Sequence, residues 1–173
     1  MPTPLLVADA GPLIALAVAD VLPQTIALYQ SLLVPQAVID ECTAMPSAPG
    51  IGPIQAALRG SALRVIAEAD IAPLDPAYAR GLGSGEVAVL AYAAQHRHVA
   101  LIDDRRARGI AQRLGVVIVG SGAVLLSLKV HRHIDSIQPA LKTWQAHGYF
   151  VGRPSSTTCC GVPARPDSDS RAQ

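Results

Sequence analysis

Acidic side chains recur in this sequence at the ends of apolar runs and near the starts of expected helices. They are Asp9, Glu41, Glu86 and the adjacent pair Asp103 and Asp104. Carboxylates that converge on one crevice repel each other unless a divalent cation, a shared proton or a basic group holds them together. Ligand sets made only of oxygen suit Mg²⁺ or Mn²⁺ rather than zinc. Such cations typically handle phosphate esters, so we expect a metal site of this kind.

Each acid also has a purely structural explanation, which the sequence leaves open. Asp9 precedes a Gly-Pro turn and is well placed to cap a helix. One of the tandem aspartates could cap the next helix while the other points into the crevice. Glu86 falls in the first turn of its helix, where a negative charge offsets the helix dipole. Glu41 stands beside an apolar stripe, three residues after Val38.

A group of arginines follows the aspartate pair. Arg105, Arg106 and Arg108 come directly after it, with Arg113 further along. At a cleft these side chains would grip phosphates in bidentate fashion, although a solvated helix face explains them equally simply. Aromatic residues make up only 3% of the chain, so an extensive base-stacking platform is not expected. Recognition of RNA would rest on backbone charge and shape.

The elements that position these residues follow from an alternation of short apolar runs and amphipathic segments. This alternation is typical of βαβ units around a parallel sheet. Strands are expected at residues 5–8, 32–34, 62–67, 99–102 and 116–119. Helices are expected at 12–19 and 23–31, from Pro35 to about Thr43, after the GLGSGE turn, near 107–114, and at 122–132 and 135–147. Residues 44–60 are expected to be a loop with room for one short helix. Strand ends and helix starts at one edge of a parallel sheet face the same cleft, so the acids should converge.

The glycine-rich turn GLGSGE does not fit a dinucleotide-binding fingerprint, because a helical run rather than a strand precedes it. The helix that follows has a predicted buried face at helical spacing. That face consists of Val87, Leu90, Ala91 and Ala94.

Length and charge limit the domain organisation and the kind of partner. The chain has 173 residues, which suits one core better than two. Residues 1–151 are expected to form one domain, and residues 152–173, rich in Pro, Ser, Thr, Arg and Asp, a disordered tail. Only 16% of residues are charged, against roughly 25% in an average soluble domain, which predicts apolar surface covered by a partner or a second copy. The net charge of +1 gives no global basic field, so nucleic-acid binding must be local.

The cysteines and the N-terminal segment indicate the compartment. Cys42, Cys159 and Cys160 contain no C-x-x-C pair, which favours a reducing cytosol without disulfides. The first 22 residues are apolar, but Asp9 and Asp20 interrupt them and no Lys or Arg precedes them. We therefore expect neither a signal peptide nor a membrane span, and a cytoplasmic protein.

Four segments, in this order and spacing, resemble the PIN domain. They are VADAGPLIAL, VPQAVIDE, GLGSGEVAVLAYA and ALIDDRRARGIAQRLG. More narrowly they are similar to the DUF3368 branch of that family, which is related to the VapC ribonuclease toxins. The resemblance covers about residues 4–151. It implies a three-layer α/β/α fold with a central, mostly parallel sheet and a Mg²⁺- or Mn²⁺-dependent endoribonuclease.

The resemblance also implies roles for the acids. Asp9, Glu41, Glu86 and Asp104 match the four acids of the family in order, with Asp103 as neighbour and substitute for the last. Asp9, Glu86 and the tandem pair would hold one or two cations, and Glu41 would bind metal or orient water. A toxin of this type would be encoded beside a small antitoxin that blocks its cleft. One departure is that Ala10-Gly11 supplies no hydroxyl where many relatives carry one.

The resulting hypothesis is a metal-dependent endoribonuclease that hydrolyses RNA phosphodiester bonds, the toxin of a type II toxin–antitoxin pair. The chief rival is a catalytically inactive PIN-like module that binds RNA or protein. A phospho-receiver domain is a weaker third choice, because its acidic pair should follow the first strand rather than lie at 103–104.

Overall fold

A short central strand organises the sheet, because it hydrogen-bonds to a neighbour on each side. In the computed structural model, which describes residues 5–149, five parallel strands lie in the order β3-β2-β1-β4-β5. They are β1 (Leu6–Ala8), β2 (Leu32–Pro35), β3 (Leu63–Ile66), β4 (Val99–Leu101) and β5 (Ile118–Val119). Each overlaps an apolar run that the sequence predicts as a strand, so all five predictions are confirmed.

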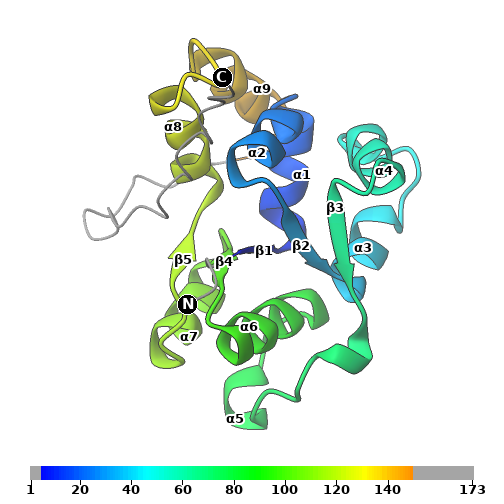
Figure 1. The fold of residues 1–173 in the computed structure, drawn as a ribbon, viewed down its shortest axis with the longest axis vertical. Coiled ribbons are helices and arrows are strands. Elements are labelled where there is room, and N and C mark those ends of the chain that lie inside the picture. The colour runs from blue at the N-terminus through cyan, green and yellow to red at the C-terminus, as the bar shows by residue number, and fades with distance from the viewer. Residues whose placement is uncertain (1–4, 150–173) are drawn as a thin grey trace, which may run out of the picture.

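Helices cover both faces of this sheet, which gives the predicted three-layer α/β/α fold (Figure 1). The helices are α1 (Ala10–Val18), α2 (Leu22–Tyr29), α3 (Gln36–Thr43), α4 (Ile51–Arg59), α5 (Pro76–Ala79), α6 (Ser84–His96), α7 (Arg105–Arg113), α8 (Ser121–Val130) and α9 (Gln138–Ala146), with a 3-10 turn at Glu68–Asp70. On one side α1 contacts α2, α4, α8 and α9, and on the other side α6 contacts α7. Helix α3 contacts both α1 and α6, so it links the two layers beside β2.

The strand register brings the carboxyl ends of β1 and β4 level. Ala8 pairs with Leu101, and the backbone N–H of Asp9 donates to the carbonyl oxygen of Leu101 at 3.1 Å. The chain runs from β1 to β2 and β3 on one side, and returns to β4 and β5 on the other. Such a reversal is a topological switch point, where open parallel sheets leave a crevice outside the strand ends. The residues that follow β1 and β4 therefore stand at this crevice.

Buried contacts hold the helical layer that contains α1 and α9 on the sheet. Strands β1, β2 and β4 are buried along their whole length, as expected for parallel strands covered on both faces. Trp144 of α9 is only 1% exposed, and its indole Nε1 donates to the carbonyl oxygen of Ala15 at 2.6 Å. This hydrogen bond satisfies the one polar atom of a large buried ring and fixes α9 against α1.

Two predictions of local structure need correction, and one is confirmed. Pro35 ends β2 in an extended conformation, paired with Ile66, instead of opening α3; lacking an N–H, proline suits a strand end as well as a helix start. The short helix expected within residues 44–60 is present as α4. On α6 the buried face is centred on Gly85, Val89 and Ala93, while Ala94 is exposed. The buried face is rotated because α6 packs on both the sheet and α3.

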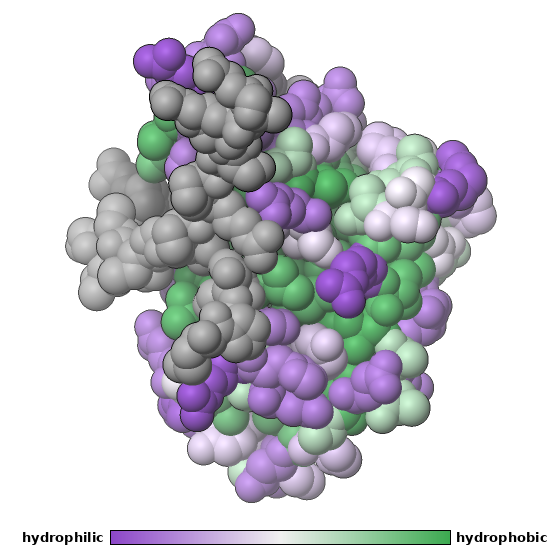
Figure 2. Space-filling view, viewed as in Figure 1, coloured by the Kyte–Doolittle hydropathy of each residue, from purple (hydrophilic) through white to green (hydrophobic). Residues whose placement is uncertain are grey.

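The surface shows how polar and apolar residues are distributed on one side of the molecule. Figure 2 shows apolar residues in the middle of this face, over β2 and β3, with polar residues over α5, α6 and α7.

Within residues 5–149 no single helix is long and apolar enough to cross a membrane. Helices α1 and α2 pass such a test only as a pair, and they are bent by 118°. The predicted disordered tail at 152–173 lies outside the described residues.

Candidate active site

Asp9 is a buried carboxylate at the carboxyl end of the central strand. It is 7% exposed, and its extended backbone (φ −85°, ψ 161°) places it at the N-cap position of α1. The side chain nevertheless makes no capping hydrogen bond. Capping geometry is therefore incomplete at Asp9, although the backbone N–H groups of Ala10 and Gly11 still favour its charged form.

The Asp9 carboxylate converges with that of Glu41 on the space beside Gly85. Glu41 projects from α3, the helix that follows β2, and Gly85 is the second residue of α6. A Cβ atom added at Gly85 would lie 3.2 Å from Oε2 of Glu41 and 3.5 Å from Oδ1 of Asp9. Two carboxylate oxygens from elements far apart in the sequence thus flank one point, and only glycine leaves that point open.

Glu86 joins this group from the first turn of α6. It is half-buried, and its Oε2 accepts a hydrogen bond from the backbone N–H of Gly83 at 2.8 Å. The bond ties the carboxylate to the N-cap of its own helix. Glu86 therefore has the structural role at the helix start that its position in the first turn suggests. The charge still acts on Asp9, because Glu86 contributes to the raised pKa of that residue.

The electrostatics of Asp9 indicate a concentration of negative charge. Burial, opposed in part by the backbone N–H groups of Ala10 and Gly11 and reinforced by the charges of Glu86 and Glu41, raises the pKa of Asp9 from 3.8 to about 6. The adjacent thiol responds in the same way. Burial and the nearby carboxylates of Glu41 and Asp9 raise the pKa of Cys42 to about 12, so this cysteine is an inert thiol at neutral pH.

The tandem aspartates stand at the same sheet edge but are both engaged at helix starts. Oδ1 of Asp104 accepts from the N–H of Ala107 at 2.8 Å and caps α7. Oδ1 of Asp103 accepts from the N–H of Ser121, the first residue of α8, at 2.9 Å. The structure therefore brings Asp9, Glu41 and Glu86 together and gives each tandem aspartate a capping contact. Among residues 5–149 no group of three or more His, Cys, Asp or Glu side chains is close enough to hold a metal ion.

Comparison with known protein families identifies the family to which this fold belongs. The family model of the PIN domain, in its DUF3368 branch, matches residues 5–158. The chain belongs to the PIN domain family. PIN domains are generally nucleases, which are hydrolases. No curated protein matches the chain.

The arginines predicted to bind RNA occupy different environments in this PIN domain. Arg105 is exposed at the start of α7. The guanidinium of Arg106 donates through Nη2 to the carbonyl oxygen of Arg80 at 3.1 Å. Nη1 of Arg108 lies near Gly120, 3.5 Å from the position of an added Cβ. Arg105 is therefore exposed, Arg106 has an intramolecular partner, and Arg108 lies beside the turn before α8.

Sequence reasoning missed one residue and one contact near the site. Gly85 keeps open the space between Asp9 and Glu41, and Arg106, predicted only to bind RNA, contacts the loop before α6. The glycine-rich turn GLGSGE contains Gly85 and could have indicated it. From the sequence this turn was considered only as a dinucleotide-binding motif, which it does not match. The contact between Arg106 and Arg80 joins residues 26 positions apart, and no local pattern encodes it.

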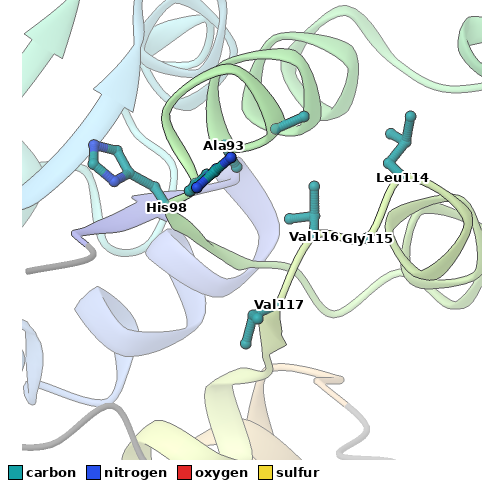
Figure 3. A pocket seen from close by; sticks show the side chains of 8 residues that line it. Ala93, His98, Leu114, Gly115, Val116 and Val117 are labelled. Carbon is teal, nitrogen blue, oxygen red and sulfur yellow. The ribbon is translucent and has the colours of Figure 1, made fainter. Parts of the chain in front are cut away.

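A separate pocket of this PIN domain lies at the opposite end of the sheet, away from the acids. It is a cavity of about 350 Å³ between the end of α6 and the residues that lead into β4 and β5. Figure 3 shows Ala93 and His98 on one side and Leu114, Val116 and Val117 on the other. Its lining contains no carboxylate, so it is not the predicted site.

Proposed function

We propose that this PIN domain is a metal-dependent endoribonuclease that hydrolyses RNA phosphodiester bonds. The observation that carries the proposal is the convergence of Asp9 Oδ1 and Glu41 Oε2 beside Gly85, with Glu86 near enough to raise the pKa of Asp9. A buried carboxylate flanked by other carboxylates has an unfavourable environment. A bound cation would remove that cost.

The donor set suits Mg²⁺ or Mn²⁺. All of the converging atoms are carboxylate oxygens, which are hard ligands. Mg²⁺ commonly binds through one or two carboxylates and keeps several waters, so the convergence of two oxygens is compatible with this ion even without a third close ligand. The cation would polarise the phosphoryl oxygen and lower the pKa of an attacking water.

The residues of the chain then have separate tasks. Asp9 and Glu86 would hold the cation from β1 and α6, and Glu41 would bind it or orient the attacking water. Asp104, and Asp103 as its neighbour, would contribute the carboxylate oxygen that capping leaves free. The site is positioned by strand ends and helix starts, which hold side chains more rigidly than loops do.

The arginines at the start of α7 would bind the RNA backbone. Arg105 and Arg108 follow the aspartate pair closely, so phosphate groups gripped there would lie beside the carboxylates, whereas Arg106 already donates to the carbonyl oxygen of Arg80. Guanidinium groups bind phosphate oxygens in bidentate fashion. Such contacts fix the register of the strand without reading its sequence.

The test is RNA cleavage in the presence of Mg²⁺ by the wild type and by Asp9→Asn. Asp135→Asn is the matched control, because it removes an exposed carboxylate between α8 and α9, outside the acidic group. We expect cleavage to fall at least about 100-fold in Asp9→Asn and to be unchanged in Asp135→Asn. Equal cleavage by Asp9→Asn and the wild type would refute the proposal.

A second candidate function is an inactive PIN-like module that binds RNA or protein. It is favoured by the absence, among residues 5–149, of any group of three potential ligands within reach of one ion. Isothermal titration with Mn²⁺ separates the two candidates. An active site should bind Mn²⁺ in a manner that depends on Asp9 and Glu41, whereas an inactive module should show no carboxylate-dependent binding.

We further propose that the nuclease is the cytoplasmic toxin of a type II toxin–antitoxin pair and forms homo-oligomers. The resemblance to the DUF3368 branch, which is related to the VapC toxins, supports the first part, and the low charge content supports the second. A short reading frame directly beside this one, whose product suppresses cleavage by the purified protein, is the expected finding. Light scattering would show a mass above 18.0 kDa if copies associate.

A further inference from the structure

The loop before α6 contains a left-handed glycine and leads directly into the helix that carries Gly85 and Glu86. Gly81 has a φ of +77°, in the left-handed region that side-chain-bearing residues rarely adopt. Two residues later Gly83 forms the N-cap of α6, where its N–H is bound by Glu86. The conformation of residues 80–83 therefore sets where the first turn of α6 begins, and with it the positions of Gly85 and Glu86.

Arg106 of α7 is bound to this loop. Its Nη2 donates to the carbonyl oxygen of Arg80 at 3.1 Å. A Cβ atom added at Gly81 would overlap the Arg106 guanidinium, so the planar group lies directly against the glycine backbone. A charged donor makes a stronger hydrogen bond than a neutral one.

A second arginine of α7 contacts the same segment. The guanidinium carbon of Arg113 lies 5.6 Å from the ring centroid of Tyr78 in α5, within the range of a cation–π contact. Arg106 and Arg113 are seven residues apart, so they project from the same face of the helix. Helix α7 thus holds the segment from α5 to α6 at two points.

We propose that Arg106 is a positioning residue of the acidic site, which acts by holding the 80–83 loop so that Gly85 and Glu86 remain beside Asp9 and Glu41. The effect of Arg106 on catalysis rests on the proposed function, whereas its contact with the 80–83 loop does not depend on that function. It assigns Arg106 a task distinct from phosphate binding. Arg105, exposed on the same helix turn, keeps the phosphate-binding role.

The first experiment measures the loop directly and needs no activity. Amide hydrogen exchange of residues 83–87 is compared in the wild type, Arg106→Ala and Lys142→Ala, a control that removes one exposed positive charge from α9. We expect exchange to be about tenfold faster in Arg106→Ala, as the loss of a charge-assisted hydrogen bond predicts, and unchanged in Lys142→Ala. Identical exchange in all three proteins would overturn the proposal.

The second experiment separates positioning from RNA binding. Arg106→Ala should weaken Mn²⁺ binding and lower kcat with KM unchanged, whereas Arg105→Ala should raise KM and leave Mn²⁺ affinity unchanged. Arg106→Lys should be intermediate, because lysine donates a hydrogen bond but lacks the plane. A rise in KM with normal Mn²⁺ affinity in Arg106→Ala would show that Arg106 only contacts RNA. If the wild type neither binds Mn²⁺ nor cleaves RNA, the proposed function fails, and the exchange experiment still decides whether Arg106 holds the loop.

A double-mutant cycle guards against misfolding as an explanation. Gly81→Ala introduces a side chain that overlaps the Arg106 guanidinium and strains a positive φ, so it should reproduce the exchange and Mn²⁺ phenotype of Arg106→Ala. Removing Arg106 relieves the overlap but not the strained φ, so the double variant should show less than the sum of the two effects. Additive effects would mean that the two residues act independently, contrary to the proposal.

Discussion

Two groups of acids stand at one edge of the same sheet and meet different physical demands. Asp103 and Asp104, after β4, each accept a backbone N–H from a helix start, at 2.9 Å and 2.8 Å. Asp9, after β1, makes no capping hydrogen bond and lies buried beside Glu41 and Glu86. The tandem pair is compensated by protein dipoles, whereas Asp9 is only partly compensated.

The comparison shows that burial and partners decide the task of an acid more than its place after a strand. A capping aspartate is exposed and satisfied, so it stabilises the native state. A buried aspartate surrounded by like charges destabilises the native state until a proton or a cation arrives. Natural proteins retain such costs at functional sites, which makes Asp9 the centre of the proposed site.

The largest expected effect comes from removing the Asp9 charge in metal-free protein. The folded pKa of about 6 lies above the ordinary 3.8, so the folded state binds more protons between these values. The free energy of unfolding that the Asp9 carboxyl contributes is therefore lost as pH rises from about 4 to 7. The loss is about 3 kcal/mol, because each unit of pKa difference corresponds to about 1.36 kcal/mol. We expect Asp9→Asn, in chelator at pH 7.5, to be more stable than the wild type by up to this amount, measured by urea unfolding.

The same pair of proteins supplies the control. At pH 4 the Asp9 carboxyl is largely neutral in the folded state, so the difference between variant and wild type should shrink. A variant that is equally destabilised at both pH values would mean that the asparagine packs badly and that the charge carries no cost. The contrast between Asp9 and the capping pair would then be lost.

The next effect concerns the space that Gly85 leaves open. A methyl group there would lie 3.1 Å from Cγ2 of Val38 and between the oxygens of Asp9 and Glu41. We expect Gly85→Ala to weaken Mn²⁺ binding about tenfold or more, since a first-turn shift of α6 moves Glu86 as well. Titration calorimetry measures this directly.

Gly109→Ala on α7 is the control, because nothing lies within 4 Å of an added Cβ there. It should stabilise the native state by roughly 0.5–1 kcal/mol. Equal Mn²⁺ affinity in both variants would remove Gly85 from the site.

Asp104 offers a smaller effect that separates capping from metal binding. Asparagine caps helices as well as aspartate does, so Asp104→Asn should leave the melting temperature nearly unchanged. Asp104→Ala should cost about 1 kcal/mol. Both should reduce RNA cleavage if the free oxygen of Asp104 serves the cation. Full cleavage by Asp104→Asn would restrict this residue to capping and would widen the difference between the two acidic groups.

The fold could be predicted from the sequence because parallel strands buried on both faces appear as continuous apolar runs. The five runs gave the five strands, and the order of the elements gave the layers. The region between β3 and α6 escaped prediction, since α5 has four residues and depends on Arg106 and Arg113 of α7 for its contacts. The buried face of α6 was misplaced at Ala94 because two neighbours, the sheet and α3, share that helix.

The sequence predicts at which edge of the sheet the candidate site lies, but not the contacts of its side chains. Strand ends locate Asp9 and the tandem aspartates, whatever their side chains do. The sequence could not tell which aspartates find N–H partners, because Ser121 is 18 residues from Asp103. The role of Gly85 depends on distances between three elements, and such distances exist only in the folded chain.

The smallest effect tests whether the three acids near Gly85 form one electrostatic unit. Glu86 contributes more than Glu41 to the raised pKa of Asp9. Glu86→Gln should therefore lower the pKa of Asp9 further than Glu41→Gln does, and its amide oxygen can still accept from the N–H of Gly83. Asp103→Asn should leave this pKa unchanged, because the tandem pair does not contribute to it. Carbon-detected NMR titration of the Asp9 carboxyl measures all three variants, and a shift in Asp103→Asn as large as that in Glu86→Gln would merge the two acidic groups into one.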